Sequence, residues 1–270
     1  MLPICDLFTS IQGEGKFAGM PSIFIRVSGC NLRCVFKGSI CDTPYSSFTP
    51  EKSSFTIEDV KNEIASHPKV NHIVITGGEP LLYKKELEEM LNQIWEDRFV
   101  ITIETNGSLP MLNPVGKFRI ALYSVSPKLH TSIPEVGQEV QTPKGLHKFT
   151  KEEVDRLEST RINVKNLAQI MMFANDYQLK FVYSGPECIK EIEDIYLKVR
   201  GSVEKDEKYH YLASYLRTNP PEKHTMLMPE GVNKEQLESK RLEMSEICIE
   251  KGWAYTDRLH ILIWGDKRGF

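Results

Sequence analysis

The chain has 270 residues, of which 40% are hydrophobic, so it can bury a full core and we expect a single domain over residues 1–270. Its formal net charge is −3, and its lysines and arginines are interleaved with acidic residues, which predicts no nucleic-acid partner because such binding needs a basic stripe. No apolar run approaches the roughly 20 residues that cross a bilayer, which predicts no membrane partner.

Runs of apolar and β-branched residues predict strands, and helical patterns fall between them. The predicted strands are residues 22–28, 72–76, 100–104, 120–125, 179–183, 225–228 and 259–264. The predicted helices are one that begins at a capping-box pattern at residues 56–59, and residues 84–97, 187–199 and 233–251. This alternation predicts a parallel α/β sheet covered by helices, either an open doubly wound sheet or a partial barrel.

Five chemically suggestive segments follow the ends of successive predicted strands. They are the cysteine loop at 30–41, Gly-Gly-Glu-Pro at 77–80, Thr-Asn-Gly at 105–107, Ser-Pro-Lys at 126–128 and Pro-Glu-Gly at 229–231. Catalytic residues of barrel-type sheets gather at the carboxyl edge of the strands. The positions therefore favour a partial, TIM-like βα barrel.

Two segments, near 137–175 and 200–210, do not fit the alternation and are interpreted as insertions. The first includes a predicted helix at 150–158 and an apolar stretch at 167–173 that we expect to pack. The second has the composition of an exposed polar linker.

Three cysteines, Cys30, Cys34 and Cys41, lie in the loop after the first predicted strand. Thiolates on such a loop can converge on an iron–sulfur cluster, and three of them leave one iron of a four-iron cluster open. Two alternatives are core cysteines that cluster by chance and a zinc site completed by Cys5, although zinc sites usually show paired short spacings. The other cysteines receive no role. We expect a reducing cytoplasm, because no secretory signal precedes Met1.

Four motifs, two of which belong to the cysteine loop, carry a family resemblance. They are residues 11–15 (Ile-Gln-Gly-Glu-Gly), 29–34 (Gly-Cys-Asn-Leu-Arg-Cys), 41–43 (Cys-Asp-Thr) and 76–80 (Thr-Gly-Gly-Glu-Pro). Together they resemble the radical S-adenosylmethionine (SAM) superfamily and, within it, the 7-carboxy-7-deazaguanine synthase family, over nearly the whole chain. One departure is the six residues between the last two cysteines, where the superfamily has two. We expect Gly38 to let the added residues bulge.

The resemblance implies three cofactors and their sites. A 4Fe–4S cluster would be held by Cys30, Cys34 and Cys41, and Mg²⁺ by Thr43, whose alternative role is to cap a turn. The residues implied to bind SAM are Ile40, Asp42, Gly77, Gly78, Glu79, Ser126, Pro127, Lys128, Met228, Pro229 and Glu230. The residues implied to bind the substrate are Ile11, Gln12, Gly13, Glu14, Arg26, Thr76 and Phe270.

Several of these residues also have a purely structural interpretation. Gly77 and Gly78 alone are typical of an ordinary strand-to-helix turn, and Lys128 of a solvated surface lysine. Arg26 is expected to bind a substrate carboxylate, or else to form a buried salt bridge. Trp264 is expected to stack on a flat ring, whereas all seven histidines are interpreted as structural or exposed.

The implied activity is that of a radical SAM lyase, which converts 6-carboxy-5,6,7,8-tetrahydropterin into 7-carboxy-7-deazaguanine and releases ammonia in deazapurine (queuosine-type) biosynthesis. The resemblance also implies a flavodoxin- or ferredoxin-type electron donor and a homodimer, and it places the carboxylate of Phe270 in the substrate site. The alternatives are an activating enzyme of the glycyl-radical type and a non-catalytic zinc or iron–sulfur protein.

Overall fold

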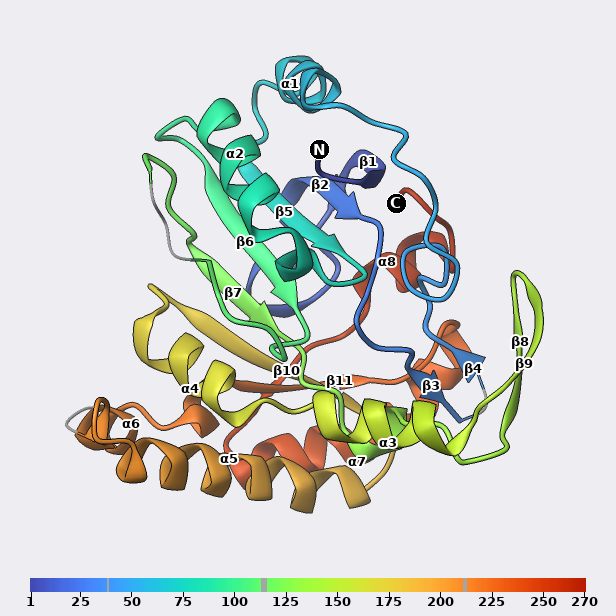
Figure 1. The fold of residues 1–270 in the computed structure, drawn as a ribbon, viewed down its shortest axis with the longest axis vertical. Helices are drawn as coiled ribbons and strands as arrows, with labels where there is room; N and C mark the ends of the chain where they lie inside the picture. The colour runs from blue at the N-terminus through green and yellow to red at the C-terminus, as the bar shows by residue number, and fades with distance from the viewer. Residues whose placement is uncertain (38, 113–115, 211–212) are drawn as a thin grey trace.

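The computed structural model describes residues 1–37, 39–112, 116–210 and 213–270. Within these residues, eight strands form one open sheet in the order β1-β2-β5-β6-β7-β10-β11-β12 (Figure 1). Strand β1 is antiparallel to β2, and every other neighbouring pair is parallel. The strands are β1 (Ile4–Ile11), β2 (Pro21–Val27), β5 (His72–Gly77), β6 (Val100–Thr105), β7 (Leu122–Val125), β10 (Tyr177–Tyr183), β11 (Thr225–Pro229) and β12 (Ala254–Tyr255). The open, mostly parallel sheet confirms the predicted α/β class and has the form of a partial barrel.

Helices connect the parallel strands and cover the sheet. They are α1 (Ile57–Ser66), α2 (Lys84–Ile94), α3 (Lys151–Thr160), α4 (Val164–Phe173), α5 (Glu187–Lys205), α6 (Ala213–Thr218), α7 (Lys234–Lys251) and α8 (Leu259–Trp264). Figure 1 shows α2 beside β5 and β6, and α4, α5 and α7 along the half of the sheet that contains β10 and β11. None of the helices in the described residues has the length and apolar character needed to cross a bilayer.

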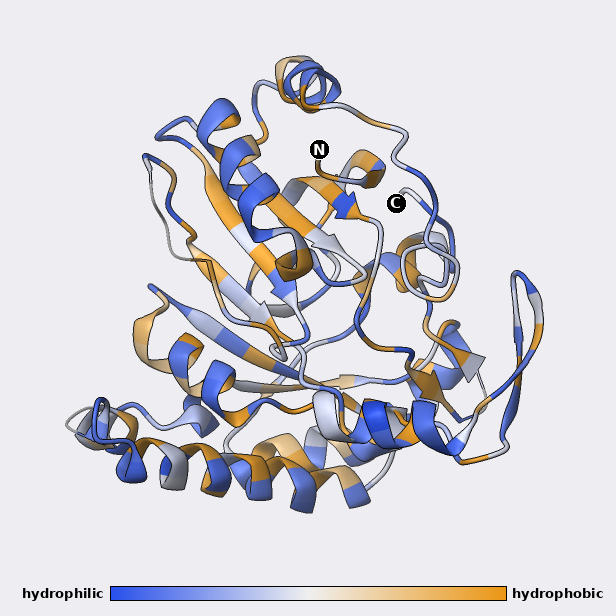
Figure 2. Ribbon diagram, viewed as in Figure 1, coloured by the Kyte–Doolittle hydropathy of each residue, from blue (hydrophilic) through white to orange (hydrophobic). Residues whose placement is uncertain are grey.

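The core lies between the sheet and these helices. Ile23, Ile25, Ile73, Ile75 and Ile101 on the central strands are fully buried. Such near-continuous apolar runs are expected where both faces of a parallel sheet are covered. Figure 2 shows these strands as mainly hydrophobic, whereas hydrophobic and hydrophilic residues alternate along α5. Each fully buried isoleucine stabilises the fold by about 1.5–3 kcal/mol, which fixes the strand ends that carry the site.

The predicted capping box at the start of α1 is confirmed. Thr56 Oγ1 accepts a hydrogen bond from the backbone N–H of Asp59 at 3.2 Å, and the Asp59 carboxylate accepts one from Thr56 N at 2.7 Å. Thr150 and Glu153 form the same arrangement at α3. Each arrangement supplies partners for N–H groups that the first helical turn leaves unpaired.

The segment 137–175 is more regular than its sequence suggested. It contains the hairpin of β8 (Glu139–Thr142) and β9 (Gly145–Lys148), which projects from the body of the molecule (Figure 1), followed by α3 and α4. The apolar stretch of α4 packs as expected, because Leu167, Ile170 and Met171 are buried. Its status as an insertion stays an interpretation.

Two predicted elements are wrong. Residues 259–264 form the helix α8 instead of a strand, and a six-residue, mainly apolar run is too short for periodicity to separate the two. The expected linker at 200–210 is also wrong over its first half, because α5 continues to Lys205 and buries Val203 one turn after Val199. Strands β1 and β12 were not predicted.

Candidate active site

A cavity of about 570 Å³ lies at the carboxyl edge of the sheet. Residues at or near the ends of β2, β5, β6, β7 and β11 line it, in the order Arg26, Thr76, Glu104, Ser126 and Met228. The cysteine loop closes one side, and residues 266–270 form part of the rim. Predicted site residues from positions 11 to 270 therefore meet in one place, as the strand-end argument predicted.

Of the predicted site residues, all of which the structure describes, every one except Glu79 and Pro127 lines this cavity. Those at the cavity are Ile11, Gln12, Gly13, Glu14, Arg26, Cys30, Cys34, Ile40, Cys41, Asp42, Thr43, Thr76, Gly77, Gly78, Ser126, Lys128, Met228, Pro229, Glu230 and Phe270. Their individual roles as ligands stay predictions.

The three loop cysteines line the same wall of the cavity. The loop doubles back through the short strands β3 (Val35–Phe36) and β4 (Ser39–Ile40), and Cys41 N donates to Cys34 O at 3.0 Å. Burial raises the pKa of the Cys30 thiol to about 11 and that of Cys34 to about 12. In the part of the chain that the structure describes, no three Cys, His, Asp or Glu side chains are arranged to hold a metal ion. The expected bulge at Gly38 lies outside the described residues.

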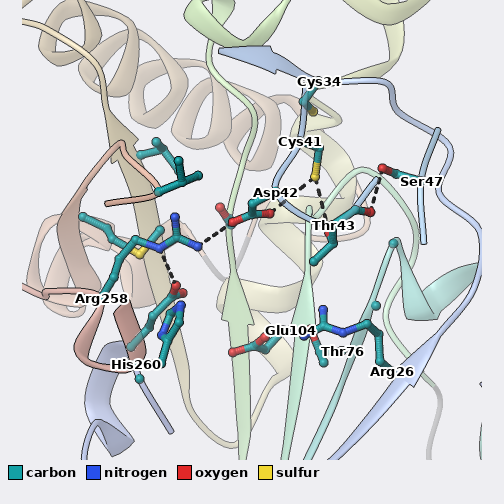
Figure 3. Close-up of a pocket in the computed structure, with 18 of the residues that line it drawn as sticks. Arg26, Cys34, Cys41, Asp42, Thr43, Ser47, Thr76, Glu104, Arg258 and His260 are labelled. Atoms are coloured by element: carbon teal, nitrogen blue, oxygen red, sulfur yellow. Dashed lines mark hydrogen bonds and ion pairs between the residues drawn. The ribbon is translucent and has the colours of Figure 1, made fainter. Parts of the chain in front are cut away.

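Thr43 turns its hydroxyl toward the cysteine loop (Figure 3). Thr43 Oγ1 lies 3.4 Å from Cys41 Sγ, whereas the carbonyl oxygen of Thr43 accepts hydrogen bonds from Ser46 Oγ and Ser47 Oγ, each at 3.0 Å. The backbone therefore closes the turn, and the hydroxyl is not needed for it.

The two glycines after β5 are required by close packing of the protein backbone. Gly77 has φ +145°, and a Cβ there would lie 2.2 Å from Val27 O; a Cβ on Gly78 would lie 2.2 Å from Gly29 O. Gly78 N and Glu79 N donate to Val27 O and Gly29 O at 3.1 and 2.8 Å. The missing side chains therefore allow close approach of Val27 at the end of β2 and of Gly29, and both glycines still line the cavity.

Glu79 lies beneath the cavity wall and is fully buried. Its carboxylate accepts hydrogen bonds from Leu81 N at 3.0 Å, Thr105 Oγ1 at 2.8 Å and Asn106 N at 2.7 Å. Burial raises the pKa of this carboxyl, although these hydrogen bonds oppose the change. Glu79 thus joins the end of β5 to the loop after β6.

A network of charged side chains crosses the cavity floor (Figure 3). The Glu14 carboxylate contacts Lys180 Nζ and lies 3.2 Å from Arg258 Nε, and a second nitrogen of the same guanidinium contacts Asp42. Lys180 Nζ is also 4.0 Å from the Glu104 carboxylate. Burial alone would raise the pKa of Glu14, but Lys180 and Arg258 hold it well below its usual range.

Comparison with known proteins identifies the family. Residues 24–175 match the family model described as the radical SAM superfamily. A 7-carboxy-7-deazaguanine synthase of Halobacterium salinarum is 36% identical over 98% of this chain and 91% of its own length, and one of Rhodopirellula baltica is 34% identical over 99% and 88%. The chain belongs to the radical SAM superfamily. Within it, the chain is a member of the 7-carboxy-7-deazaguanine synthase family.

A solved structure supports the same fold. The crystal structure of QueE from Escherichia coli matches with a TM-score of 0.53 and 22% identity, covering 96% of this chain and 94% of that one. This radical SAM protein is therefore a lyase of queuosine-type biosynthesis, whose family uses a 4Fe–4S cluster and SAM. The predicted fold class and activity are confirmed.

The residues present suit these cofactors. Three soft sulfur donors line one wall of the cavity, and their neighbour Lys128 favours the ionised thiolates that an iron–sulfur cluster requires. Lys128 Nζ donates to Ser126 Oγ at 3.0 Å on the same wall. Although these side chains are not arranged around a single metal ion, the three sulfur donors and the nearby cation suit an iron–sulfur cluster.

Several residues of this radical SAM site were not predicted. The Lys180 side chain is only 6% exposed, and the other residues from 179 to 183 are apolar or aromatic, so a lysine in this run was a usable signal. Arg258 and Glu104 were also not among the predicted site residues, and both line the cavity. His260, interpreted as structural or exposed, lines the cavity, and a Cβ on Gly13 would lie 2.0 Å from its Nδ1.

Two further residues had an expected role at the substrate. Arg26 lines the cavity, as a carboxylate binder must, whereas Trp264 does not. The Nε of Arg26 also lies 3.7 Å from Asp6 Oδ2, the acidic partner of its structural interpretation. The Trp264 ring packs on the Phe270 ring, with 5.8 Å between centroids. The stacking of Trp264 on a flat substrate ring stays a prediction.

Proposed function

We propose that the cavity is the site at which this enzyme converts 6-carboxy-5,6,7,8-tetrahydropterin into 7-carboxy-7-deazaguanine. The observation that carries the proposal is the meeting, in one cavity, of the cysteine loop with Glu14 and Arg26. The first supplies the cluster ligands, and the other two suit a heterocycle that bears amide-like donors and a carboxylate.

The cysteine side of the cavity is proposed to hold the cofactors. Cys30, Cys34 and Cys41 bind the 4Fe–4S cluster, which supplies the electron that cleaves SAM. Ser126 and Lys128 bind polar groups of SAM, since both line the cavity and are hydrogen-bonded to each other. The other proposed SAM contacts are Ile40, Asp42, Gly77, Gly78, Met228, Pro229 and Glu230.

The opposite side is proposed to bind the pterin. Lys180 and Arg258 keep Glu14 ionised, so this carboxylate accepts hydrogen bonds from N–H groups of the ring. The Gln12 amide is engaged within the protein, because it donates to Glu104 at 3.2 Å and accepts from Glu14 N at 3.2 Å. Gln12 therefore orients the Glu104 carboxylate and holds the backbone of Glu14, whereas Arg26 binds the carboxylate of the substrate.

Thr43 is proposed as a ligand of Mg²⁺. Its hydroxyl is free of the turn that the Thr43 carbonyl closes, and it lies at the boundary between the cysteine loop and the substrate side. A hydroxyl is a hard oxygen ligand of the kind that Mg²⁺ prefers. The ion would hold the substrate carboxylate together with Arg26.

We further propose a homodimer, a flavodoxin- or ferredoxin-type electron donor and a cytoplasmic location. Large apolar side chains exposed on α5 and α7 support a contact between subunits: Leu197 is 63% exposed, Leu242 73% and Ile249 82%. A cluster held by thiolates suits a reducing compartment.

The cysteine assignment is tested by replacing each cysteine with alanine. Cys30→Ala, Cys34→Ala and Cys41→Ala are expected to abolish the visible absorbance of the reconstituted cluster and the cleavage of SAM. Cys188→Ala and Cys248→Ala are matched controls, because both thiols are buried in the helical layer. Equal losses in all five variants would refute the ligand assignment.

A further inference from the structure

The segment 265–270 follows α8 and forms part of the cavity rim, beside β1 (Figure 1). Arg268 holds this segment on the loop at residues 45–51. Its guanidinium donates to both oxygens of Glu51 at 3.0 and 2.8 Å and to Cys5 O at 3.1 Å. The same group lies 3.8 Å from the centroid of the Tyr45 ring. A bidentate bond and a stacked ring together fix the guanidinium in one plane.

Arg268 also engages Asp6, which lies between two arginines. Asp6 Oδ2 accepts hydrogen bonds from Arg268 Nε at 3.2 Å and Tyr45 Oη at 3.3 Å. Arg26 Nε is 3.7 Å from the same oxygen, and among the described residues it is a buried donor that makes no hydrogen bond. Asp6 and Arg26 are opposite each other in the register of β1 and β2. The hydrogen bonds to Asp6 Oδ2 thus come from Arg268 and Tyr45, whereas Arg26 keeps only an ion-pair contact with this oxygen.

The hydrogen bonds that Asp6 accepts determine what Arg26 can bind in the cavity. A full ion pair with Asp6 would draw the Arg26 guanidinium toward β1 and satisfy it there. With Asp6 engaged by Arg268, the Arg26 guanidinium keeps its hydrogen-bonding capacity for an anion in the cavity that it lines.

We propose that Arg268 is a positioning residue for substrate binding. It fixes the 265–270 segment at the cavity rim, and by occupying Asp6 it leaves Arg26 available to an anionic group of the substrate. This inference rests on the proposed function, in which that group is the carboxylate of the pterin.

The variant Arg268→Ala tests both parts, with Arg98→Ala as a matched control. Arg98 also donates to a carboxylate, Glu96, at 2.7 Å and lies 4.5 Å from the Phe99 ring centroid, but on the outer surface. We expect Arg268→Ala to raise the KM for the pterin about tenfold, with kcat and SAM binding near those of the wild type, as for loss of a charge-assisted contact. Arg98→Ala should leave all three unchanged.

Amide hydrogen exchange of residues 265–270 gives a readout that does not depend on activity. In Arg268→Ala we expect exchange in this segment to be at least about tenfold faster, whereas Arg98→Ala should match the wild type. If the wild-type protein failed to act on the pterin, the proposed function would be refuted. The exchange result would still test whether Arg268 fixes the segment 265–270. Unchanged exchange in Arg268→Ala would overturn the proposal.

The role of Asp6 is tested in a double-mutant cycle. Asp6→Asn removes the charge that competes for Arg26, so Arg268→Ala should raise the pterin KM by a smaller factor in the Asp6→Asn background than alone. An equal rise in both backgrounds would overturn the claim that Arg268 acts through Asp6.

Discussion

Two clusters of buried polar side chains lie on the same sheet and differ in charge. At the amino end of β5, His72 makes hydrogen bonds with Ser22 Oγ at 2.7 Å and Thr102 Oγ1 at 2.8 Å, and burial lowers its pKa to about 4. This cluster is neutral at pH 7. At the carboxyl edge, Glu14 and Lys180 remain ionised, because burial is outweighed by the opposite charges around each of them.

The difference separates a structural cluster from a functional one. A neutral, hydrogen-bonded cluster fixes strand register at little cost. A buried ion pair stabilises a fold no better than a hydrophobic pair of the same size, and it becomes costly when one partner is lost. This comparison favours a binding role for the charged groups buried at the cavity and a structural role for the neutral His72 cluster.

Loss of one charge at the cavity should have the largest effect on stability. In Lys180→Met, Glu14 loses a partner of opposite charge, so we expect the free energy of unfolding at pH 7 to fall by about 3–5 kcal/mol, measured by urea denaturation. The double variant Glu14→Gln/Lys180→Met should recover most of this loss. A single variant within about 1 kcal/mol of the wild type would contradict the distinction between the clusters.

The second-largest effect is expected in the pH dependence of the unfolding free energy, which should differ between the two clusters. The pKa of His72 is about 4 in the folded protein and about 6.5 unfolded, so the unfolded chain binds the proton first and stability falls as pH drops from 6.5 to 4, by roughly 3 kcal/mol. Glu14 and Asp42 have lowered pKa values, so their contribution is lost only below about pH 4.

The variant His72→Leu isolates the first of these windows. Its urea denaturation should show a flatter stability profile between pH 6.5 and 4 than the wild type, with the decline below pH 4 retained. Parallel profiles for the two proteins would show that His72 is not held neutral by burial.

The smallest effect is expected from Thr102→Val. The change removes the hydroxyl that pairs with His72 Nε2 and keeps the side-chain volume, so we expect a loss of about 1–2 kcal/mol in unfolding free energy. The KM for the pterin should stay at the wild-type value, because Thr102 lies at the structural cluster. A raised KM would link the two clusters and remove the distinction.

Local sequence patterns were sufficient for much of the fold and for the place of the site. Apolar runs gave the parallel strands β2, β5 and β6, and the spacing of Thr56 and Asp59 gave a helix start. The strand-end positions of the motifs gave the cavity, because parallel strands bring their carboxyl ends to one edge.

The rest depends on contacts between distant parts of the chain. Lys180 meets Glu14 across 166 positions and Arg258 meets it across 244, and no local period encodes such pairs. Strand β1 was missed because its weak pattern becomes a strand only when paired with β2. The short run of α8 is helical, and its first residue is held by a distant part of the chain. Leu259 N donates a hydrogen bond to Gly13 O at 2.9 Å.

The central claim is that one cavity joins the cluster cysteines to a pterin site. Its most direct test is anaerobic reconstitution, followed by incubation with SAM, a reductant, Mg²⁺ and 6-carboxy-5,6,7,8-tetrahydropterin. We predict about four irons per chain and SAM-dependent formation of 7-carboxy-7-deazaguanine with release of ammonia. A protein with a full cluster that cleaves SAM but returns the pterin unchanged would contradict the account.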